Sequence, residues 1–178
     1  MAGLSSAIYK VMTMFTKIID GVTRACFFLA TLSLGLIVAV FSIEVIMRYF
    51  FASPTFWALD TVTFLFCASL MLALPEVTRT DGHIAVSIIL DFSSRGFANK
   101  FRLIIYLVSL VVVSYVAYIT LVEFSRLFET GINTLGSFRV PKWMVFGLIP
   151  LGLFLSALQF VLLLKKQLSE VHLDRKGA

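Results

Sequence analysis

Three residues that can take part in acid–base or anion-binding chemistry lie within five positions of each other: Arg79, Asp81 and His83, in the segment VTRTDGHIAV (77–86). Histidine exchanges protons near neutral pH, so this segment is the first candidate for a catalytic site. However, apolar stretches flank it on both sides, and no residue with metal-ligand or catalytic spacing accompanies His83. We therefore expect His83 to have a structural role where the chain leaves a helix.

Glu44 is the second candidate, because a carboxylate inside a membrane helix can couple proton movement to transport, as in a stand-alone small exporter. Arg48 follows four residues later, and an acid four positions before a base is the favoured order for an ion pair along a helix. Both residues lie near one end of an apolar run, where charged side chains reach the membrane surface. We expect an interfacial ion pair, and the proton-coupled exporter stays open as an alternative.

Patterns that indicate an enzyme or a cofactor are absent from the sequence. Both histidines, His83 and His172, lie outside the long apolar runs, which argues against a haem held between membrane helices. Cys26 and Cys67 are far apart and have no metal-binding spacing. There is no Gly-rich phosphate loop, serine elbow or pair of catalytic carboxylates. The sequence therefore predicts no enzymatic activity, no cofactor and no metal site.

The composition indicates what kind of fold must position these residues. Of the 178 residues, 60% are hydrophobic and 14% are charged, and the mean hydropathy is +0.99. Soluble domains contain only about half apolar residues. A transmembrane barrel would instead show short segments of alternating polarity. We predict an all-α integral membrane protein.

Charged residues divide the apolar sequence into four uncharged runs, at 25–43, 61–75, 103–122 and 143–164. A membrane-spanning helix needs about 20 mostly apolar residues. The second run reaches that length once its flanking residues are included. The sequence therefore predicts four transmembrane helices, at 25–47, 57–77, 103–122 and 143–164.

Two further segments are amphipathic and are expected to lie along the membrane surface. Residues 4–22 repeat apolar side chains every three or four positions, and three basic residues follow one another at intervals of seven. Residues 84–101 begin with a second, shorter apolar stripe between the second and third spans. We predict an N-terminal interfacial helix, a surface arm at 84–101 and a tail at 165–178, all within a single membrane domain.

The distribution of Lys and Arg predicts the orientation in the membrane. With four spans, the N-terminal segment, the 76–102 connection and the tail lie on one side, and they carry eleven of the 15 Lys and Arg residues. The positive-inside rule places that side, with both termini, in the cytoplasm. The net charge of +5 thus indicates orientation rather than a nucleic-acid partner.

Small and polar residues in the predicted spans indicate contacts between helices. Gly35 with Ala39, and Gly152 with Ser156, are small residues four positions apart, which allow close helix packing. The spans hold almost no ionisable residues, which favours a helper subunit over an ion-translocating protein. Four polar residues of the third and fourth spans are expected to make contacts between helices rather than to bind a substrate: Tyr115, Tyr118, Thr120 and Gln159.

Two separated motifs resemble those of one transporter family. RYFFASPTFWALD (48–60) contains Arg-Tyr followed by Trp-x-x-acid, and TRTDGHIAV (78–86) contains Arg followed by Gly-His-Ile-x-Val. Both resemble motifs of the small, DctQ-type membrane subunit of tripartite ATP-independent periplasmic (TRAP) transporters. The sequence departs from the family pattern at Asp60, where Glu is more common, and at Ser87, where an acid is common. The matching residues are Arg48, Tyr49, Trp57, Asp60, Arg79, Gly82, His83 and Ile84.

The resemblance implies a subunit of a larger complex in the bacterial inner membrane. Its partners would be a large membrane subunit, a periplasmic substrate-binding protein and membrane lipids at the subunit interface. The complex would use a sodium gradient to take up an organic acid, such as a C4-dicarboxylate or sialic acid, and this chain would be a scaffold. Arg48, Arg139 and Lys142 on the outer connections are candidates for docking the binding protein. An accessory subunit of another membrane complex stays open as a second alternative.

Overall fold

The chain is helical in the part described by the computed structural model. The description covers residues 2–80, 95–134, 136 and 139–176, with side chains for 14–80, 101–134, 136 and 139–168. These residues contain no β-strand beyond an isolated bridge between Asn133 and Pro141. Four helical segments are long and apolar enough to cross a membrane, which confirms the predicted all-α fold with four spans. The helices are α1 (Ala2–Phe50), α2 (Ala58–Arg79), α4 (Arg95–Thr130), α5 (Lys142–Phe146) and α6 (Leu148–Lys176).

α1 is one continuous helix of 49 residues, about 73 Å long at 1.5 Å per residue. The predicted interfacial helix at 4–22 and the predicted span at 25–47 are joined without interruption. Gly21 is the only Gly or Pro near the junction, and one glycine inside a helix costs only about 1 kcal/mol relative to alanine. Because a bilayer core is about 30 Å thick, α1 either tilts strongly or extends beyond that core.

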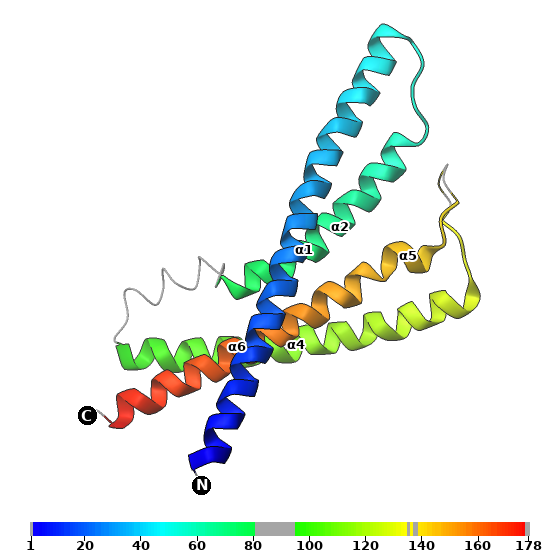
Figure 1. The fold of residues 1–178 in the computed structure, drawn as a ribbon. Helices are drawn as coiled ribbons and strands as arrows, with labels where there is room; N and C mark the ends of the chain where they lie inside the picture. Colours follow the sequence, from blue (N-terminus) through cyan, green and yellow to red (C-terminus); the bar gives the residue numbers. More distant parts are fainter. Residues whose placement is uncertain (1, 81–94, 135, 137–138, 177–178) are drawn as a thin grey trace.

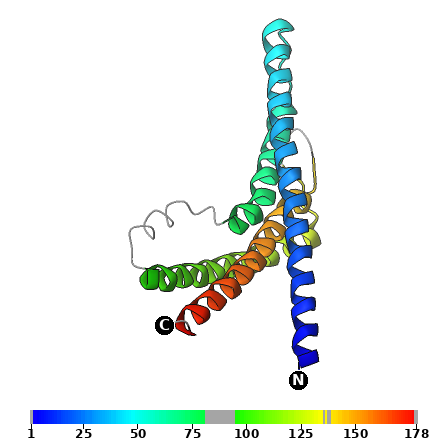
Figure 2. The same cartoon turned by 60° about the vertical axis from the view of Figure 1, so that its left-hand side comes forward.

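The helices form an open row in the order α1, α2, α6, α4 (Figures 1 and 2). α2 packs against α1 and α6, and α6 packs in turn against α4. In the most apolar window of each span, 28% of the residues are buried for α2 and for the α5–α6 span, but only 11% for α1 and 6% for α4. The two outer helices therefore present most of their apolar surface to the surroundings.

α4 extends the predicted third span at both ends, since it runs from Arg95 to Thr130 whereas the sequence predicted 103–122. Its first turns belong to the predicted arm, of which residues 84–94 lie outside the described part of the chain. Beyond the predicted span, Arg126 Nε donates to Glu123 Oε2 at 2.9 Å. The two exposed residues lie one turn apart on α4 and form an ion pair. The helix therefore continues past its apolar segment with Glu123 and Arg126 paired.

A break at Gly147 divides the fourth span into α5 and α6. Pro150 has no N–H and cannot donate to the carbonyl of Phe146, four residues earlier, which interrupts the regular helical bonding. α5 remains attached to α4 through aromatic packing, because the rings of Trp143 and Phe128 meet edge to face with their centroids 5.4 Å apart. α5 therefore stays packed against α4, although the regular helical bonding is interrupted between α5 and α6.

Candidate interaction surfaces

The first group of predicted site residues lies at the loop end of the molecule, defined here as residues 44–60 and 131–142. Glu44 is only 8% exposed. Its carboxylate accepts hydrogen bonds from Arg48 Nη2 at 2.8 Å, from the Thr55 backbone N–H at 3.0 Å and from the Thr55 hydroxyl. The predicted ion pair with Arg48 is thus present. Both carboxylate oxygens have partners, so Glu44 closes the α1–α2 loop, which favours the structural interpretation over the proton carrier.

A second contact at the loop end joins the two helix hairpins of the chain. One hairpin is formed by α1 and α2, and the other by α4 with α5 and α6. Asp60, in the first turn of α2, lies so close to Gly136 in the α4–α5 loop that a Cβ at Gly136 would collide with the carboxylate. This loop folds back on itself, with the Thr134 N–H donating to the Val140 carbonyl at 2.9 Å. In the sequence, Asp60 is recognised only as part of a family motif. No local pattern around Gly136 indicates that Asp60 lies beside it. The contact is therefore a finding of the structure alone.

The three predicted docking cations belong to two different hairpins. The Arg48 side chain, at the end of α1, is 61% exposed. Arg139 is exposed in the α4–α5 loop, and Lys142 is half-buried at the start of α5. Tyr49 and Trp57, the aromatic residues of the same predicted motif as Arg48, are both exposed on the α1–α2 hairpin. The cations thus share the loop end but are carried by separate connections.

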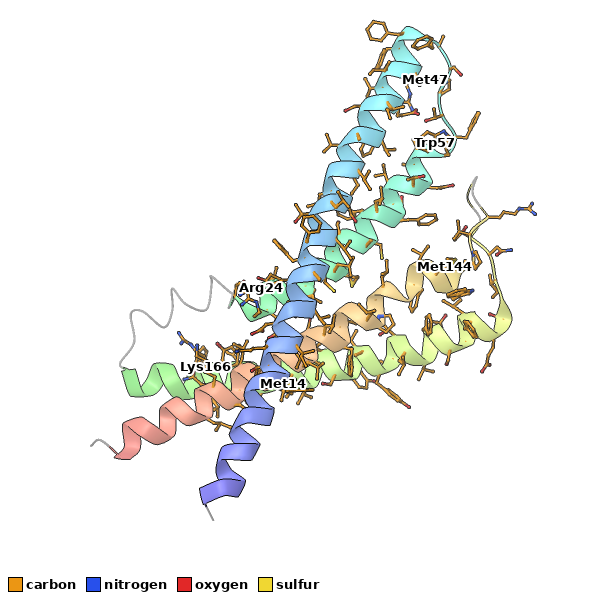
Figure 3. The ribbon with its side chains drawn as sticks, viewed as in Figure 1. Met14, Arg24, Met47, Trp57, Met144 and Lys166 are labelled. Atoms are coloured by element: carbon orange, nitrogen blue, oxygen red, sulfur yellow. The ribbon has the colours of Figure 1, made fainter. Side chains whose placement is uncertain are left out.

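The other end of α2 holds charged residues from two helices. Glu76 and Arg79 pair along α2, with Arg79 Nε donating to Glu76 Oε2 at 2.7 Å. Arg24 of α1 interacts electrostatically with Glu76, and Asp20 of α1 with Arg79; Figure 3 shows Arg24 beside the end of α2. Opposite charges therefore connect α1 to the end of α2. The remaining residues of the predicted Arg79 motif lie outside the described part of the chain: Gly82, His83 and Ile84.

A buried polar contact joins α1 to α6. Gln159 Nε2 donates to Thr23 Oγ1 at 2.9 Å and lies 3.3 Å from Asp20 Oδ1. Gln159 is 2% exposed and Thr23 is completely buried. The predicted interhelical contact is confirmed for Gln159. Its partners were missed because Asp20 was assigned to the predicted surface segment at 4–22, and Thr23 lies just beyond that segment, outside every predicted span.

Within the described chain, Tyr115, Tyr118 and Thr120 of α4 show no hydrogen bond to another helix, and an interhelical contact of these residues with a partner subunit stays a prediction. Tyr115 and Tyr118 are 64% and 67% exposed. The hydroxyl of Thr120 donates to the carbonyl of Val116 in its own helix at 3.0 Å. The reason is the position of α4 at the edge of the row, where most of its circumference meets no other helix of the described chain.

The two hairpins approach closely at Gly152, where α6 crosses α2. A Cβ built on Gly152 would collide with the backbone carbonyl of Met71. Pro75, four residues after Met71, has no N–H, so this carbonyl lacks its usual helical donor. Gly152 lets α6 cover the carbonyl, and Ser156, only 1% exposed, packs one turn further on and donates to the Gly152 carbonyl at 2.9 Å. A proline on one helix and a glycine on the other thus produce the close contact.

The other predicted small-residue pair lies on an exposed face of α1. No atom lies within 4 Å of a Cβ built on Gly35, and Ala39 is exposed. Large apolar neighbours on the helix are exposed as well, including Leu32 and Val38. Gly35 therefore packs against no other helix of the described chain, and a contact between this pair and a partner stays a prediction.

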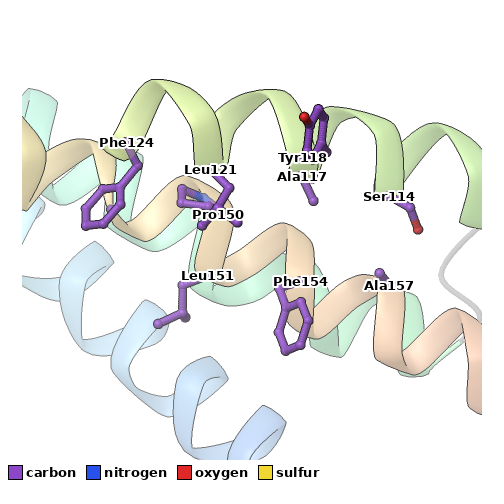
Figure 4. A pocket seen from close by; sticks show the side chains of 10 residues that line it. Ser114, Ala117, Tyr118, Leu121, Phe124, Pro150, Leu151, Phe154 and Ala157 are labelled. Atoms are coloured by element: carbon purple, nitrogen blue, oxygen red, sulfur yellow. The ribbon is translucent and has the colours of Figure 1, made fainter. Parts of the chain in front are cut away.

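A groove of about 620 Å³ lies between α4 and α6 (Figure 4). Most of its lining is apolar, and Ser114 and Tyr118 contribute the polar side chains. Pro150, Leu151 and Phe154 line it from α6. Such a lining suits an acyl chain or an apolar helix and offers few groups to a charged substrate.

Comparison with known proteins identifies the family of this chain. The sequence model of the DctQ component of tripartite ATP-independent periplasmic transporters matches residues 37–170. The chain belongs to the DctQ family. No curated protein matches the sequence.

The DctQ match begins within α1 and ends within α6, so it includes the loop end and the contact between Gly152 and Met71. Asp20 and Thr23 precede the match, so the hydrogen bond from Gln159 ties the DctQ region to the first part of α1. As a DctQ protein, the chain is the small, multi-pass membrane component of a TRAP transporter in the inner membrane. The family associates with a large membrane subunit and a binding protein and is a transporter component rather than an enzyme family.

Proposed function

We propose that this chain is the scaffold subunit of a sodium-driven, binding-protein-dependent importer of an organic acid, of the C4-dicarboxylate or sialic acid type. The observation that carries the proposal is the open row of helices, with 11% and 6% of the apolar windows of α1 and α4 buried. A row of this kind encloses no path across the membrane. It supports attachment to a larger subunit that contains the path.

The internal contacts of the chain suit a scaffold that keeps its shape while a partner moves. The two hairpins are joined at three levels: by Asp60 and Gly136 at the loop end, by Gly152 and Met71 in the middle, and by Gln159 and Thr23 between α6 and α1. The outward faces of α1 and α4 remain for the large subunit and for lipids at the interface. The N-terminal part of α1 and the arm at 84–101 would hold the scaffold at a fixed depth in the membrane.

The loop end would face the periplasm, with both termini in the cytoplasm. Arg139 and Lys142 would then offer positive charge to a docking binding protein. Replacing both by Glu should lower uptake that depends on the binding protein, whereas Lys165→Glu with Lys166→Glu on α6 is a matched charge reversal at the opposite face. Equal uptake in the two double variants would refute the docking role.

Co-purification tests the scaffold proposal. The tagged chain, expressed with the membrane protein encoded beside it, should purify with a much larger multi-span subunit and without haem absorbance. A partner from a respiratory enzyme would contradict the proposal and support an accessory role in another complex. Proton-driven transport by the purified chain alone would instead support the small exporter.

A further inference from the structure

The α1–α2 hairpin ends in a group of aromatic side chains with no assigned role as a group, called here the aromatic tip: Tyr49, Phe50, Phe51, Phe56 and Trp57. Their exposed fractions are 78%, 82%, 67%, 80% and 38%. Figure 3 labels Trp57 and the nearby Met47 at this end of the hairpin. Three phenylalanines that are mostly exposed in the isolated chain require a covering that is at least partly apolar.

The side chains of the aromatic tip leave the hairpin in several directions. Successive residues of a helix are about 100° apart around its axis, so Tyr49 and Phe50 at the end of α1 diverge. Phe51 follows the helix end, and Phe56 lies on the far side of the loop. A protein that approaches from one side covers only part of such an arrangement. A lipid layer can cover all of it at once.

The backbone beneath the aromatic tip is held in place. Glu44 binds both the N–H and the hydroxyl of Thr55, which ties the two sides of the loop together. Ala52 adopts the left-handed backbone region, at φ +50°, to complete the turn. The tip therefore presents its rings from a defined loop.

An accessible guanidinium adjoins the aromatic tip, and its charge is paired with the buried carboxylate of Glu44. Arg48 donates through Nη2 to Glu44, yet its side chain is 61% exposed. A guanidinium has five N–H donors, so it can bind Glu44 and still donate to a phosphate oxygen. An exposed arginine adjoining exposed aromatic rings matches the chemistry of the phospholipid headgroup layer, where aromatic side chains also concentrate in membrane proteins.

We propose that the aromatic tip is a lipid anchor, inserted into the headgroup layer of the leaflet at the loop end, with Arg48 binding lipid phosphates. The anchor continues the apolar surfaces of the two spans it joins, for example at Leu59, which is 70% exposed. It fixes the depth of the α1–α2 hairpin independently of any transport partner. It also assigns Arg48 to the membrane, leaving Arg139 and Lys142 for docking.

The test measures the depth of the tip in the bilayer. Nitroxide labels are attached to Phe50→Cys and, separately, to Phe56→Cys, in the full chain carrying Cys26→Ala and Cys67→Ala. The chain is placed in vesicles of phosphatidylethanolamine and phosphatidylglycerol, and label collisions with oxygen and with a water-soluble nickel chelate are compared. Val38→Cys, at an exposed position along the apolar part of α1, and Arg139→Cys, in the α4–α5 loop, are the matched controls.

Both tip labels should give ratios of oxygen to nickel collisions between those of the two controls, as expected for the headgroup layer. A ratio equal to that of the Arg139→Cys label would place the tip in water and overturn the proposal. Few collisions with either reagent, in the chain alone or in its complex, would show a protein covering and also overturn it.

A second measurement leaves the aromatic tip unchanged. In the Trp143→Phe variant, Trp57 is the remaining tryptophan. Lipids brominated at the upper acyl positions should quench its fluorescence more than lipids brominated near the bilayer centre. Absence of quenching by either lipid would contradict insertion, whether or not the cysteine variants fold.

Discussion

The contact between α2 and α6 makes the sharpest prediction about stability, because two of the helical glycines, Gly152 and Gly35, lie in opposite environments. A Cβ at Gly152 would meet the backbone of Met71, whereas a Cβ at Gly35 would meet nothing within 4 Å. The same substitution, glycine to alanine, should therefore change the stability of the isolated chain in opposite directions at the two positions.

The size of each effect follows from two opposing terms. Alanine is favoured over glycine inside a helix by about 1 kcal/mol. Overpacking a tight contact costs about 1–3 kcal/mol, and the upper part of that range applies at Gly152 because the obstacle is backbone, which cannot rotate away. We expect Gly152→Ala to destabilise the chain by about 2 kcal/mol after the helix term is subtracted. Gly35→Ala should stabilise it by up to about 1 kcal/mol.

The free energy of unfolding is measured on the full chain by titrating detergent micelles with a denaturing detergent and recording tryptophan fluorescence and circular dichroism. The close contact between α2 and α6 would be refuted if both substitutions changed the free energy of unfolding equally. It would also be refuted if Gly152→Ala left the chain as stable as the unsubstituted one. The same Gly35→Ala variant can then be tested for binding to the large subunit. Loss of binding together with a stable chain would assign Gly35 and Ala39 to the partner interface.

Three further predictions concern the other contacts of the scaffold. In a double-mutant cycle, Thr23→Val and Gln159→Leu should show a coupling energy of about 0.6 kcal/mol, with an upper bound of about 2 kcal/mol. A coupling energy of zero would contradict the hydrogen bond between the two side chains. Glu44→Ala should cost about 1–3 kcal/mol, measured in the same unfolding titration, because it leaves loop donors without an acceptor; an unchanged midpoint would show that Glu44 does not hold the loop. Gly136→Ala should cost about 1 kcal/mol, the lower end of the range for overpacking, because the Asp60 carboxylate that it meets can rotate away. Adding Asp60→Ala to Gly136→Ala should restore part of the lost stability. If the losses of the two single variants simply add in the double variant, the contact is contradicted.

The fold was largely predictable because its dominant signal is local. Runs of uncharged residues bounded by charges gave the four spans, and the structure has a membrane-length helix at each of them. The pair of Glu44 and Arg48 was predictable for the same reason, since both residues lie on one helix and their spacing determines whether they meet.

Contacts between helices were less accessible to sequence reasoning. Gln159 was recognised as a residue that needs a partner, but its partner Thr23 lies between the predicted surface segment and the first predicted span, where no pattern indicates a contact. The pairing of Gly152 with Met71 depends on Pro75, whose missing N–H matters only once α6 is known to cross α2 at that level. Tyr115 and Tyr118 could not be placed from sequence, because their exposure depends on α4 standing at the edge of the row.

Uptake by reconstituted vesicles tests the central claim, that this chain is a scaffold and not itself the transport path. Vesicles are prepared with this chain alone, with the large subunit alone and with both, each supplied with the binding protein and an imposed sodium or proton gradient. If the chain is a scaffold, binding-protein-dependent uptake of an organic acid under a sodium gradient should occur in the vesicles that contain both membrane subunits. Transport under a proton gradient in the vesicles that contain this chain alone would contradict the scaffold role.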